Sequence, residues 1–269
     1  MPFDSRELGL RLRAAEALAR EVGEIARRRF LDRGSFTVGM KGPQDFLTEV
    51  DGEVERLVAA RLHQLFPGDG FIGEEGAGRP AQEDAPTWVV DPIDGTANFS
   101  RGVPHWCVSI ALVRGGEMLA GAIFDPMLNE LFSGALGGGA FLNGAPIRVS
   151  ATPDMGRASV EVGWNMRTGP EIFLNVVGRV VAQGSGMQRC GSGALALAYV
   201  AAGRSDAFIE YHINAWDCLA GNLLVAEAGG YVSDFLARDG LHKGNALLAC
   251  APSLRDPLLE IARAEGFAL

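Results

Sequence analysis

The chain has 269 residues, a formal net charge of −9 and 48% hydrophobic residues, which suits one large globular domain or two closely packed lobes. No run approaches the ~18 consecutive apolar residues of a membrane span, and glutamates interrupt the N-terminal segment where a signal peptide would be apolar. Because neither feature is present, we expect a cytoplasmic protein with no membrane association. The acidic balance argues against direct binding of nucleic acid.

The first predicted elements are two amphipathic helices. Apolar residues at 3.6-residue spacing predict a helix over residues 5–29, preceded by Asp4 in the position of a cap. A second helix is predicted to begin between Thr48 and Asp51 and to end before Pro67.

Strand-like segments follow, beginning with two short apolar runs at residues 71–72 and 88–90 that lead directly into acidic residues. A meander is then predicted over residues 107–113, 118–124 and 130–133. Asn143-Gly144 is a strong signal for a hairpin turn before residues 146–149.

The second half of the chain alternates between helix and strand. Helices are predicted over residues 171–182, 193–202, 217–228 and 254–264, and strands over residues 206–211 and 246–250. This alternation indicates an α/β protein in layers, with a lobe boundary near residue 150.

The most informative stretch is Asp91-Pro-Ile-Asp94-Gly-Thr96, which follows the apolar run at residues 88–90. We expect the strand to deliver Asp91 at its end, and Pro92 to turn the chain away. Two carboxylates on one rigid turn suit a hard cation, because magnesium prefers oxygen ligands. If a helical turn begins at residues 97–99, the amides of Gly95 and Thr96 can also receive a phosphate.

Three further acidic residues lie where a strand ends or a helix begins: Asp51, Glu74 and Asp217. Each alone is explained by a solvated loop or by the helix dipole. Their joint occurrence with Asp91 and Asp94 favours a functional cluster, since the ends of rigid elements hold side chains in place.

In this order, the segments resemble the inositol monophosphatase family. Its first motif is present as Gly73-Glu74-Glu75 leading to Asp91-Pro-Ile-Asp-Gly-Thr96, and its second as Trp216-Asp217-Cys-Leu-Ala-Gly221. The resemblance implies a single catalytic domain with a layered αβαβα sandwich of the inositol monophosphatase and fructose-1,6-bisphosphatase type. Its N-terminal lobe would span about residues 1–149 and its C-terminal lobe about residues 150–269.

The resemblance also implies a magnesium-dependent, lithium-inhibited phosphatase that acts on a small phosphate monoester, most of all inositol monophosphate. One Mg²⁺ would be held by Glu74, Asp91 and the carbonyl of Ile93, and a second by Asp91, Asp94 and Asp217. A third, weaker ion near Glu74 is also possible in the family. A water activated by the metal would be the nucleophile, and a homodimer is expected.

The same resemblance assigns the remaining residues of the reaction. The implied catalytic residues are Asp51, Thr96 and Glu74, with Thr96 bonded to Asp51 to orient the water. The implied substrate contacts are Asp94, Gly95, Thr96, Gly193, Ala194, Glu210 and Asp217. Lys41 lies where the family has a lysine in a loop near the metals, although a solvated surface lysine is an equal alternative.

Three alternatives remain open at this point. Relatives act on histidinol phosphate or on several sugar phosphates, and some bacterial members are binding partners in transcription or RNA processing. Gly191-Ser-Gly193-Ala-Leu-Ala196 also fits a dinucleotide-binding fingerprint, but residues 187–190 do not suggest the strand that should precede it.

Overall fold

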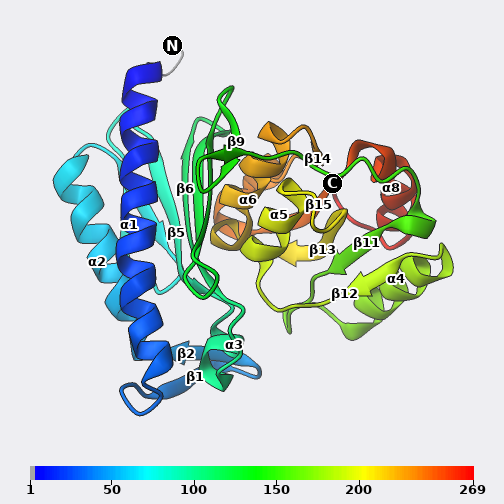
Figure 1. Cartoon of the computed structure of the whole chain (residues 1–269), viewed down its shortest axis with the longest axis horizontal. Coiled ribbons are helices and arrows are strands. Elements are labelled where there is room, and N and C mark those ends of the chain that lie inside the picture. Colours follow the sequence, from blue (N-terminus) through cyan, green and yellow to red (C-terminus); the bar gives the residue numbers. More distant parts are fainter. Residues whose placement is uncertain (1–3) are drawn as a thin grey trace.

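In the computed structural model, which describes residues 4–269, two β-sheets alternate with layers of helices on both sides and between them (Figure 1). The predicted α/β fold in αβαβα layers is therefore confirmed. The eight-stranded sheet takes its strands from residues 70–146 and the five-stranded sheet from residues 159–250. The division into two lobes at about residue 149 stays a prediction. None of the helices within residues 4–269 is both long enough and apolar enough to cross a bilayer.

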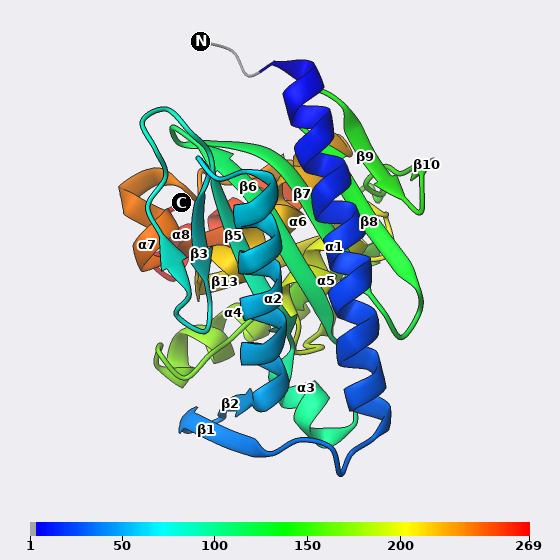
Figure 2. The ribbon, with the colours of Figure 1, turned by 90° about the vertical axis from the view of Figure 1, so that its left-hand side faces the viewer.

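Helices α1 (Ser5–Leu31) and α2 (Glu49–Leu65) cover the outer face of the large sheet (Figure 2). The backbone N–H of Arg6 donates to the side chain of Asp4, so the predicted cap is present. One face of each helix packs on the strands in a core that includes Val22, Val54 and Trp88, all fully buried. Both helices are confirmed, and α1 continues two residues beyond its predicted end.

The large sheet has the strand order β10-β9-β8-β7-β6-β5-β3-β4. The strands are β3 (Gly70–Gly73), β4 (Gly78–Arg79), β5 (Thr87–Asp94), β6 (Cys107–Arg114), β7 (Glu117–Asp125), β8 (Glu130–Ala135), β9 (Gly139–Leu142) and β10 (Ala145–Pro146). The predicted turn at Asn143-Gly144 joins β9 and β10, and both of its residues have positive φ, at 48° and 80°. The strand after it ends at Pro146, earlier than predicted.

Strand β5 carries the motif at residues 91–96, and here one expectation is wrong. Pro92 does not end the strand, which continues to Asp94 with a shift of register against β6 between Asp91 and Asp94. A proline lacks the N–H that a regular ladder needs, and an irregularity in the pairing accommodates it. The chain then turns at Gly95, whose φ is +98°, into the short helix α3 (Thr96–Arg101) that the sequence suggested.

A two-stranded hairpin, β1 (Val38–Gly42) and β2 (Asp45–Thr48), precedes α2 and was not predicted. Its first strand is almost entirely exposed, with Val38 48% and Met40 58% accessible, so it leaves no alternating apolar pattern to detect. The hairpin lies beside α3, at the end of the molecule where β5 ends (Figure 2).

Helices α5 (Gly193–Ala201) and α6 (Ala215–Glu227) form the layer between the two sheets (Figure 1). They are apolar on nearly all sides, as a layer enclosed by two sheets requires, and pack against both in one core. Both helices are confirmed, with α6 beginning two residues before its predicted start.

The five-stranded sheet has the order β12-β11-β13-β15-β14. Its strands are β11 (Ser159–Val162), β12 (Gly186–Gln188), β13 (Ala207–Ile213), β14 (Tyr231–Val232) and β15 (Asn245–Cys250). Helices α4 (Pro170–Ala182) and α8 (Arg255–Ala264) cover its outer face, and the short α7 (Gly240–Lys243) precedes β15 (Figure 1). Strands β11 and β14 were not predicted, and the expectation of no strand near residue 187 was wrong, because the exposed edge strand β12 lies there.

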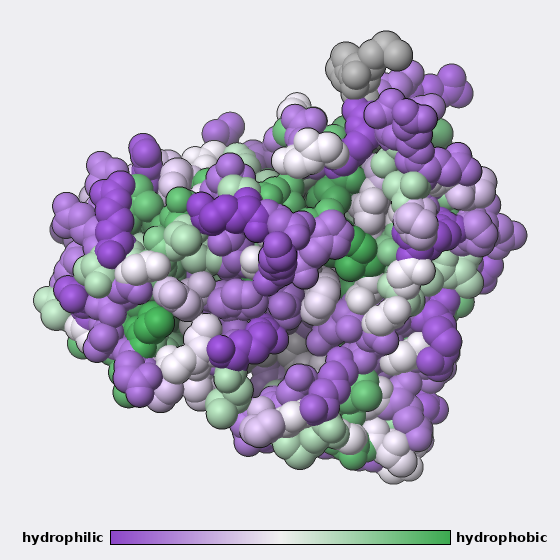
Figure 3. Space-filling view, turned by 180° about the vertical axis from the view of Figure 1, so that it is seen from behind, coloured by the Kyte–Doolittle hydropathy of each residue, from purple (hydrophilic) through white to green (hydrophobic). Residues whose placement is uncertain are grey.

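Hydrophilic side chains surround a hollow on the face opposite to the view of Figure 1 (Figure 3).

Candidate active site

Three carboxylates from three separate elements meet where β3 and β5 end. Glu74 follows β3 directly, Asp91 lies in β5, and Asp217 lies in the first turn of α6. One oxygen of each lies within 4.8 Å of the others. The parallel pairing of β3 with β5 brings Glu74 and Asp91 together. Helix α6, which packs against β5 from the layer between the two sheets, adds Asp217.

The three carboxylates are crowded in a way that favours a bound cation. Burial raises the pKa of Glu74 to about 8, with the charge of Asp217 adding to the effect. Burial and the neighbouring acids raise the pKa of Asp91 well above its usual range. Within residues 4–269, Glu74 has an ion pair only with Lys41, whose Nζ lies 3.7 Å from Oε1. A group of oxygen donors with so little compensating charge fits a hard divalent ion.

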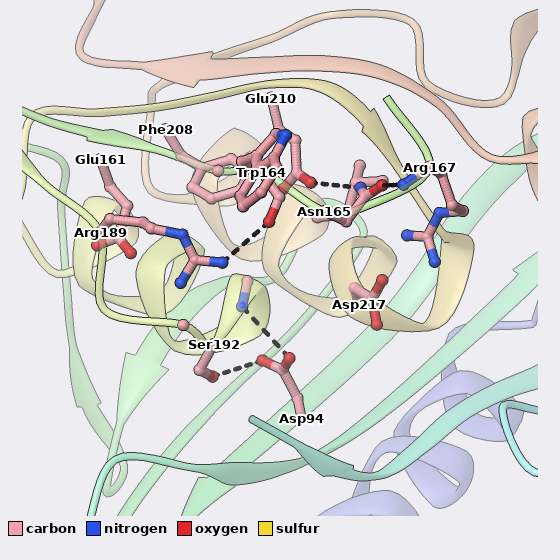
Figure 4. A pocket seen from close by; sticks show the side chains of 14 residues that line it. Asp94, Glu161, Trp164, Asn165, Arg167, Arg189, Ser192, Phe208, Glu210 and Asp217 are labelled. Atoms are coloured by element: carbon pink, nitrogen blue, oxygen red, sulfur yellow. Dashed lines mark hydrogen bonds between the residues drawn. The ribbon is translucent and has the colours of Figure 1, made fainter. Parts of the chain in front are cut away.

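Asp94 lies next to this cluster, but its carboxylate faces the N-terminus of α5. Oδ2 accepts the hydroxyl of Ser192 at 2.5 Å, which Figure 4 shows, and the backbone N–H of Ala194 at 2.7 Å. The N–H of Gly193 lies 3.3 Å from Oδ1. Burial raises the pKa of Asp94 to about 7, while these hydrogen bonds lower it. The structure thus joins Asp94 to two of the predicted substrate contacts, Gly193 and Ala194.

Asp51 and Thr96 form the predicted pair. Oγ1 of Thr96 lies 3.0 Å from Oδ1 of Asp51 and 2.9 Å from the carbonyl oxygen of Ile93. Asp51 is fully buried at the start of α2, where the N–H of Thr48 donates to its second oxygen at 2.9 Å. Burial raises the pKa of Asp51 to about 6. Asp51 is therefore placed to accept a hydrogen bond from the hydroxyl of Thr96. The carbonyl oxygen of Ile93 is a second acceptor within reach of the same hydroxyl.

Glu55 supports the loop that carries Glu74, and sequence reasoning did not find it. Its carboxylate, on α2, accepts the backbone N–H groups of Glu75 at 2.7 Å and of Ala77 at 2.8 Å. It is only 2% exposed, and burial raises its pKa. Lys41 closes the loop from the other side, with Nζ 2.7 Å from Oε1 of Glu75. Lys41 is thus an exposed residue that pairs with Glu74 and Glu75, and its role in the reaction stays a prediction.

A polar cavity of about 160 Å³ opens beside Asp94 and Asp217 (Figure 4). Glu210, on β13, lines it and accepts the side-chain amide of Asn165 at 2.9 Å. Burial raises the pKa of Glu210 to about 8, and the nearby charge of Asp217 contributes. Glu210 thus lines the cavity, and its role as a substrate contact stays a prediction.

The cavity has further lining residues that sequence reasoning missed. They come from the segment after β11 and from the segment between β12 and α5, and include Trp164, Asn165, Arg167 and Arg189; Ser192, which the resemblance placed in a turn on the substrate side, lines the cavity as well. Only Ser192 carries a local signal, since a serine two residues before an apolar run is a typical N-cap, and its hydroxyl does accept the N–H of Leu195.

Comparison with known proteins places the chain in a family. The model of the inositol monophosphatase family matches residues 10–265. The chain is 39% identical to an inositol-1-monophosphatase of Rhizobium meliloti over 82% of this chain and 81% of the relative. It is 41% identical to the Nus factor SuhB of Xylella fastidiosa, over 82% of this chain and 80% of the relative.

Solved structures agree with this placement. The extragenic suppressor protein SuhB from Bartonella henselae superposes with a TM-score of 0.86 and 34% identity, over 96% of this chain and 98% of that one. An inositol monophosphatase from Thermotoga maritima superposes with a TM-score of 0.84 and 32% identity, over 95% and 97%. Because the family model matches residues 10–265, the dinucleotide-binding alternative is set aside, and the chain belongs to the inositol monophosphatase family.

Proposed function

We propose that this phosphatase hydrolyses a small phosphate monoester in a magnesium-dependent reaction, with inositol monophosphate as the first candidate substrate. The observation that carries the proposal is the meeting of Glu74, Asp91 and Asp217 within 4.8 Å, beside a polar cavity lined by Glu210. The relative from Rhizobium meliloti is named an inositol-1-monophosphatase, which supports the choice of substrate.

The proposal includes two magnesium sites that share one ligand, and the grouping of Glu74, Asp91 and Asp217 supports it. Glu74, Asp91 and the carbonyl of Ile93 would hold one ion, and Asp91, Asp94 and Asp217 the other; a third, weaker ion near Glu74 belongs to the same proposal. When bound, the ions would neutralise charge on the phosphate and lower the pKa of a water molecule. All the side-chain donors are carboxylates, the ligands that magnesium prefers.

The chain's own residues then orient the reactants and hold a proton. Thr96 orients the attacking water through its hydroxyl, because that hydroxyl can donate to Asp51 while its lone pair accepts from the water. Asp51 is buried, and its pKa of about 6 suits a base that is ionised near neutral pH and can accept a proton. The amides of Gly95 and Thr96 would bind the phosphate.

Substrate hydroxyl groups would be held on the other side of the cavity. Glu210 accepts hydrogen bonds from them, and Asn165 fixes the carboxylate for that purpose. Asp94, Gly193, Ala194 and Asp217 would complete this wall. Lys41, paired with Glu75, adds positive charge at the edge of the site.

The test is release of phosphate by the pure protein with and without Mg²⁺. The substrates would be inositol 1-phosphate, histidinol phosphate, fructose 1,6-bisphosphate and 3′-phosphoadenosine 5′-phosphate. Magnesium-dependent release from inositol 1-phosphate at the highest kcat/KM is expected. A higher kcat/KM on histidinol phosphate or a sugar phosphate would make that compound the preferred substrate in place of inositol 1-phosphate. No release of phosphate from any of them would reject the proposal.

A second function of another class is suggested by the relative named Nus factor SuhB, namely a binding role in transcription or RNA processing. The change Asp94→Asn separates the two. If a cellular phenotype of deleting the gene is not rescued by the Asp94→Asn protein, catalysis is the basis of that role; rescue would assign it to binding.

Three further properties belong to the proposal and rest on the family resemblance. They are inhibition by lithium, a cytoplasmic location and a homodimer.

A further inference from the structure

The connection at residues 189–192 joins β12 to the N-terminus of α5. Ser192 at its end caps the helix and donates its hydroxyl to Asp94, and the N–H groups of Gly193 and Ala194 donate to the same carboxylate. The position of this wall of the cavity therefore depends on where the connection lies. Two side chains from other elements hold it, and neither is assigned to the proposed reaction.

The first of these side chains is Asn98, in α3. Its Nδ2 donates to the carbonyl of Cys190 at 2.9 Å and to the carbonyl of His105 at 2.8 Å. His105 lies between α3 and β6 of the eight-stranded sheet, whereas Cys190 follows β12 of the five-stranded sheet (Figure 1). One amide group thus ties together segments that belong to the two sheets.

The second side chain is Glu161, in β11. It lines the cavity and is only 4% exposed, and its Oε1 accepts the backbone N–H of Cys190 at 2.7 Å. Asn98 and Glu161 therefore bind the C=O and the N–H of the same residue, one from the side of each sheet. A shift of the connection would break at least one of these hydrogen bonds and leave a partly buried polar group without its partner, which costs free energy.

The connection also touches the turn at Gly95, whose amide is proposed to bind the phosphate. A Cβ atom at Gly95 would lie 3.3 Å from the carbonyl oxygen of Gly191 and 3.1 Å from that of His105. The groups proposed for the phosphate and those proposed for the substrate hydroxyls thus lie on two backbone segments in direct contact. Asn98 follows Gly95 by three residues and binds the other segment, so it links the two.

We propose that Asn98 and Glu161 are positioning residues, which together hold the connection at residues 189–192 against the turn at Gly95. They would thereby set the distance between the groups that bind the phosphate and those that bind the substrate hydroxyls. The effect on activity rests on the proposed phosphatase function. Loss of either hold should raise KM for a substrate that needs both segments, and should lower kcat less.

The first test is the steady-state kinetics of Asn98→Leu, which keeps the shape of the side chain and removes both donors. KM for inositol 1-phosphate should rise about fivefold, and kcat should fall less than about twofold. KM for p-nitrophenyl phosphate should change less than about twofold, because that compound has no hydroxyl groups to bind at α5. Asn175→Leu, an exposed change on α4 that removes a hydrogen bond to Glu265, serves as the control. Equal losses on both substrates would overturn the role of Asn98.

The variants Glu161→Gln and Glu161→Met separate the hydrogen bond from the charge and the shape of the side chain. Glutamine keeps an acceptor oxygen for the N–H of Cys190, so KM for inositol 1-phosphate should stay within about twofold of the wild-type value. Methionine has a similar shape and no such oxygen, so KM should rise about fivefold. Equal KM values for the two variants would overturn the role of Glu161.

Hydrogen exchange of the full chain gives a readout that does not depend on catalysis. Asn98→Leu and Glu161→Met should each make the backbone amides of residues 190–195 exchange about fivefold faster, because this segment opens more easily without its hold. The amides of α8 should exchange at the wild-type rate.

Unchanged exchange at residues 190–195 in both variants would reject the inference, and so would an equal acceleration in α8, which would indicate a general loss of stability. If no substrate releases phosphate with Mg²⁺, the proposed function fails. The exchange measurement then still decides whether Asn98 and Glu161 hold the connection.

Discussion

The carboxylate of Glu55 occupies the space that a Cβ atom at Gly73 would need. Gly73 ends β3 and Glu74 follows it, so this contact joins helix α2 to the loop that carries one of the three clustered acids. A glycine at this point allows Glu55 to come close enough to accept two backbone N–H groups of the loop. The position of Glu74 thus depends on a buried residue that would contact neither metal nor substrate.

Glu55→Gln should raise the magnesium concentration for half-maximal activity by about tenfold, the usual effect of losing a supporting contact at a metal site. A glutamine has one acceptor oxygen, so its NH₂ group would face one of the two loop N–H groups. A magnesium titration of phosphate release measures the effect, with Glu53→Gln, an exposed change on the same helix, as the control. A change in kcat at unchanged magnesium dependence would show that Glu55 does not act through the metal site.

Asp91→Asn and Asp217→Asn should each lower kcat at least about 100-fold, which corresponds to about 2.7 kcal/mol of lost transition-state stabilisation. The amide keeps the shape of the side chain but removes the negative charge that would hold the cation. Steady-state assays at saturating Mg²⁺ measure the loss. Asp256→Asn, exposed on α8, should have normal activity, and near-normal activity of either cluster variant would remove that residue from the metal site.

Thr96→Val should lower kcat about 100-fold and leave the magnesium dependence unchanged. Valine has nearly the shape of threonine but has no hydroxyl to bond to Asp51, and positioned proton transfer typically contributes a factor of this size. Thr96→Ser restores the hydroxyl and should recover most of the activity. If serine gives no recovery, the role of Thr96 lies in packing and not in the hydrogen bond.

The metal-free protein should lose stability as the pH rises from about 5 to 8. Burial raises the pKa of Glu74 to about 8 and that of Asp94 to about 7, so the folded state keeps protons that the unfolded state releases near its usual pKa of about 4. The free energy of unfolding therefore falls across this range.

Bound magnesium should reverse this trend, because it stabilises the deprotonated carboxylates of the folded state. The increase in Tm on addition of Mg²⁺ should be larger at pH 8 than at pH 5, and thermal denaturation in EDTA and in excess Mg²⁺ measures both effects. A metal-free Tm that is equal or higher at pH 8 than at pH 5 would contradict the prediction.

The helices and the main strands could be predicted because each has a periodic apolar pattern and a recognisable end. The hairpin at residues 38–48 could not, since it is exposed and packs few side chains. Asp91 and Asp217 could be selected because they lie in motifs with a fixed order, and the structure brings them together with Glu74. Pro92 was misjudged, since a break in register lets a strand continue through a proline.

The residues that support the site gave no signal in the sequence. Glu55 is one acid among many on an amphipathic helix, and only the path of the loop at residues 74–77 shows why it is buried. Arg167 and Arg189 lie 22 positions apart in exposed segments, and they face one cavity only because β11 and β12 are neighbours in the sheet. Contacts of this kind depend on tertiary packing and not on local pattern.

The carboxylate of Asp94 accepts hydrogen bonds from the N-terminus of α5, and in the proposed function it would also bind a magnesium ion. Both interactions would use the oxygens of one carboxylate, so ion binding and the order of the first turn of α5 would be thermodynamically linked. The coupling is reciprocal: if order in that turn changes the affinity for the ion by some factor, the bound ion changes the equilibrium for ordering the turn by the same factor. The order of the first turn of α5, which forms one wall of the substrate cavity, would therefore depend on whether the metal is bound.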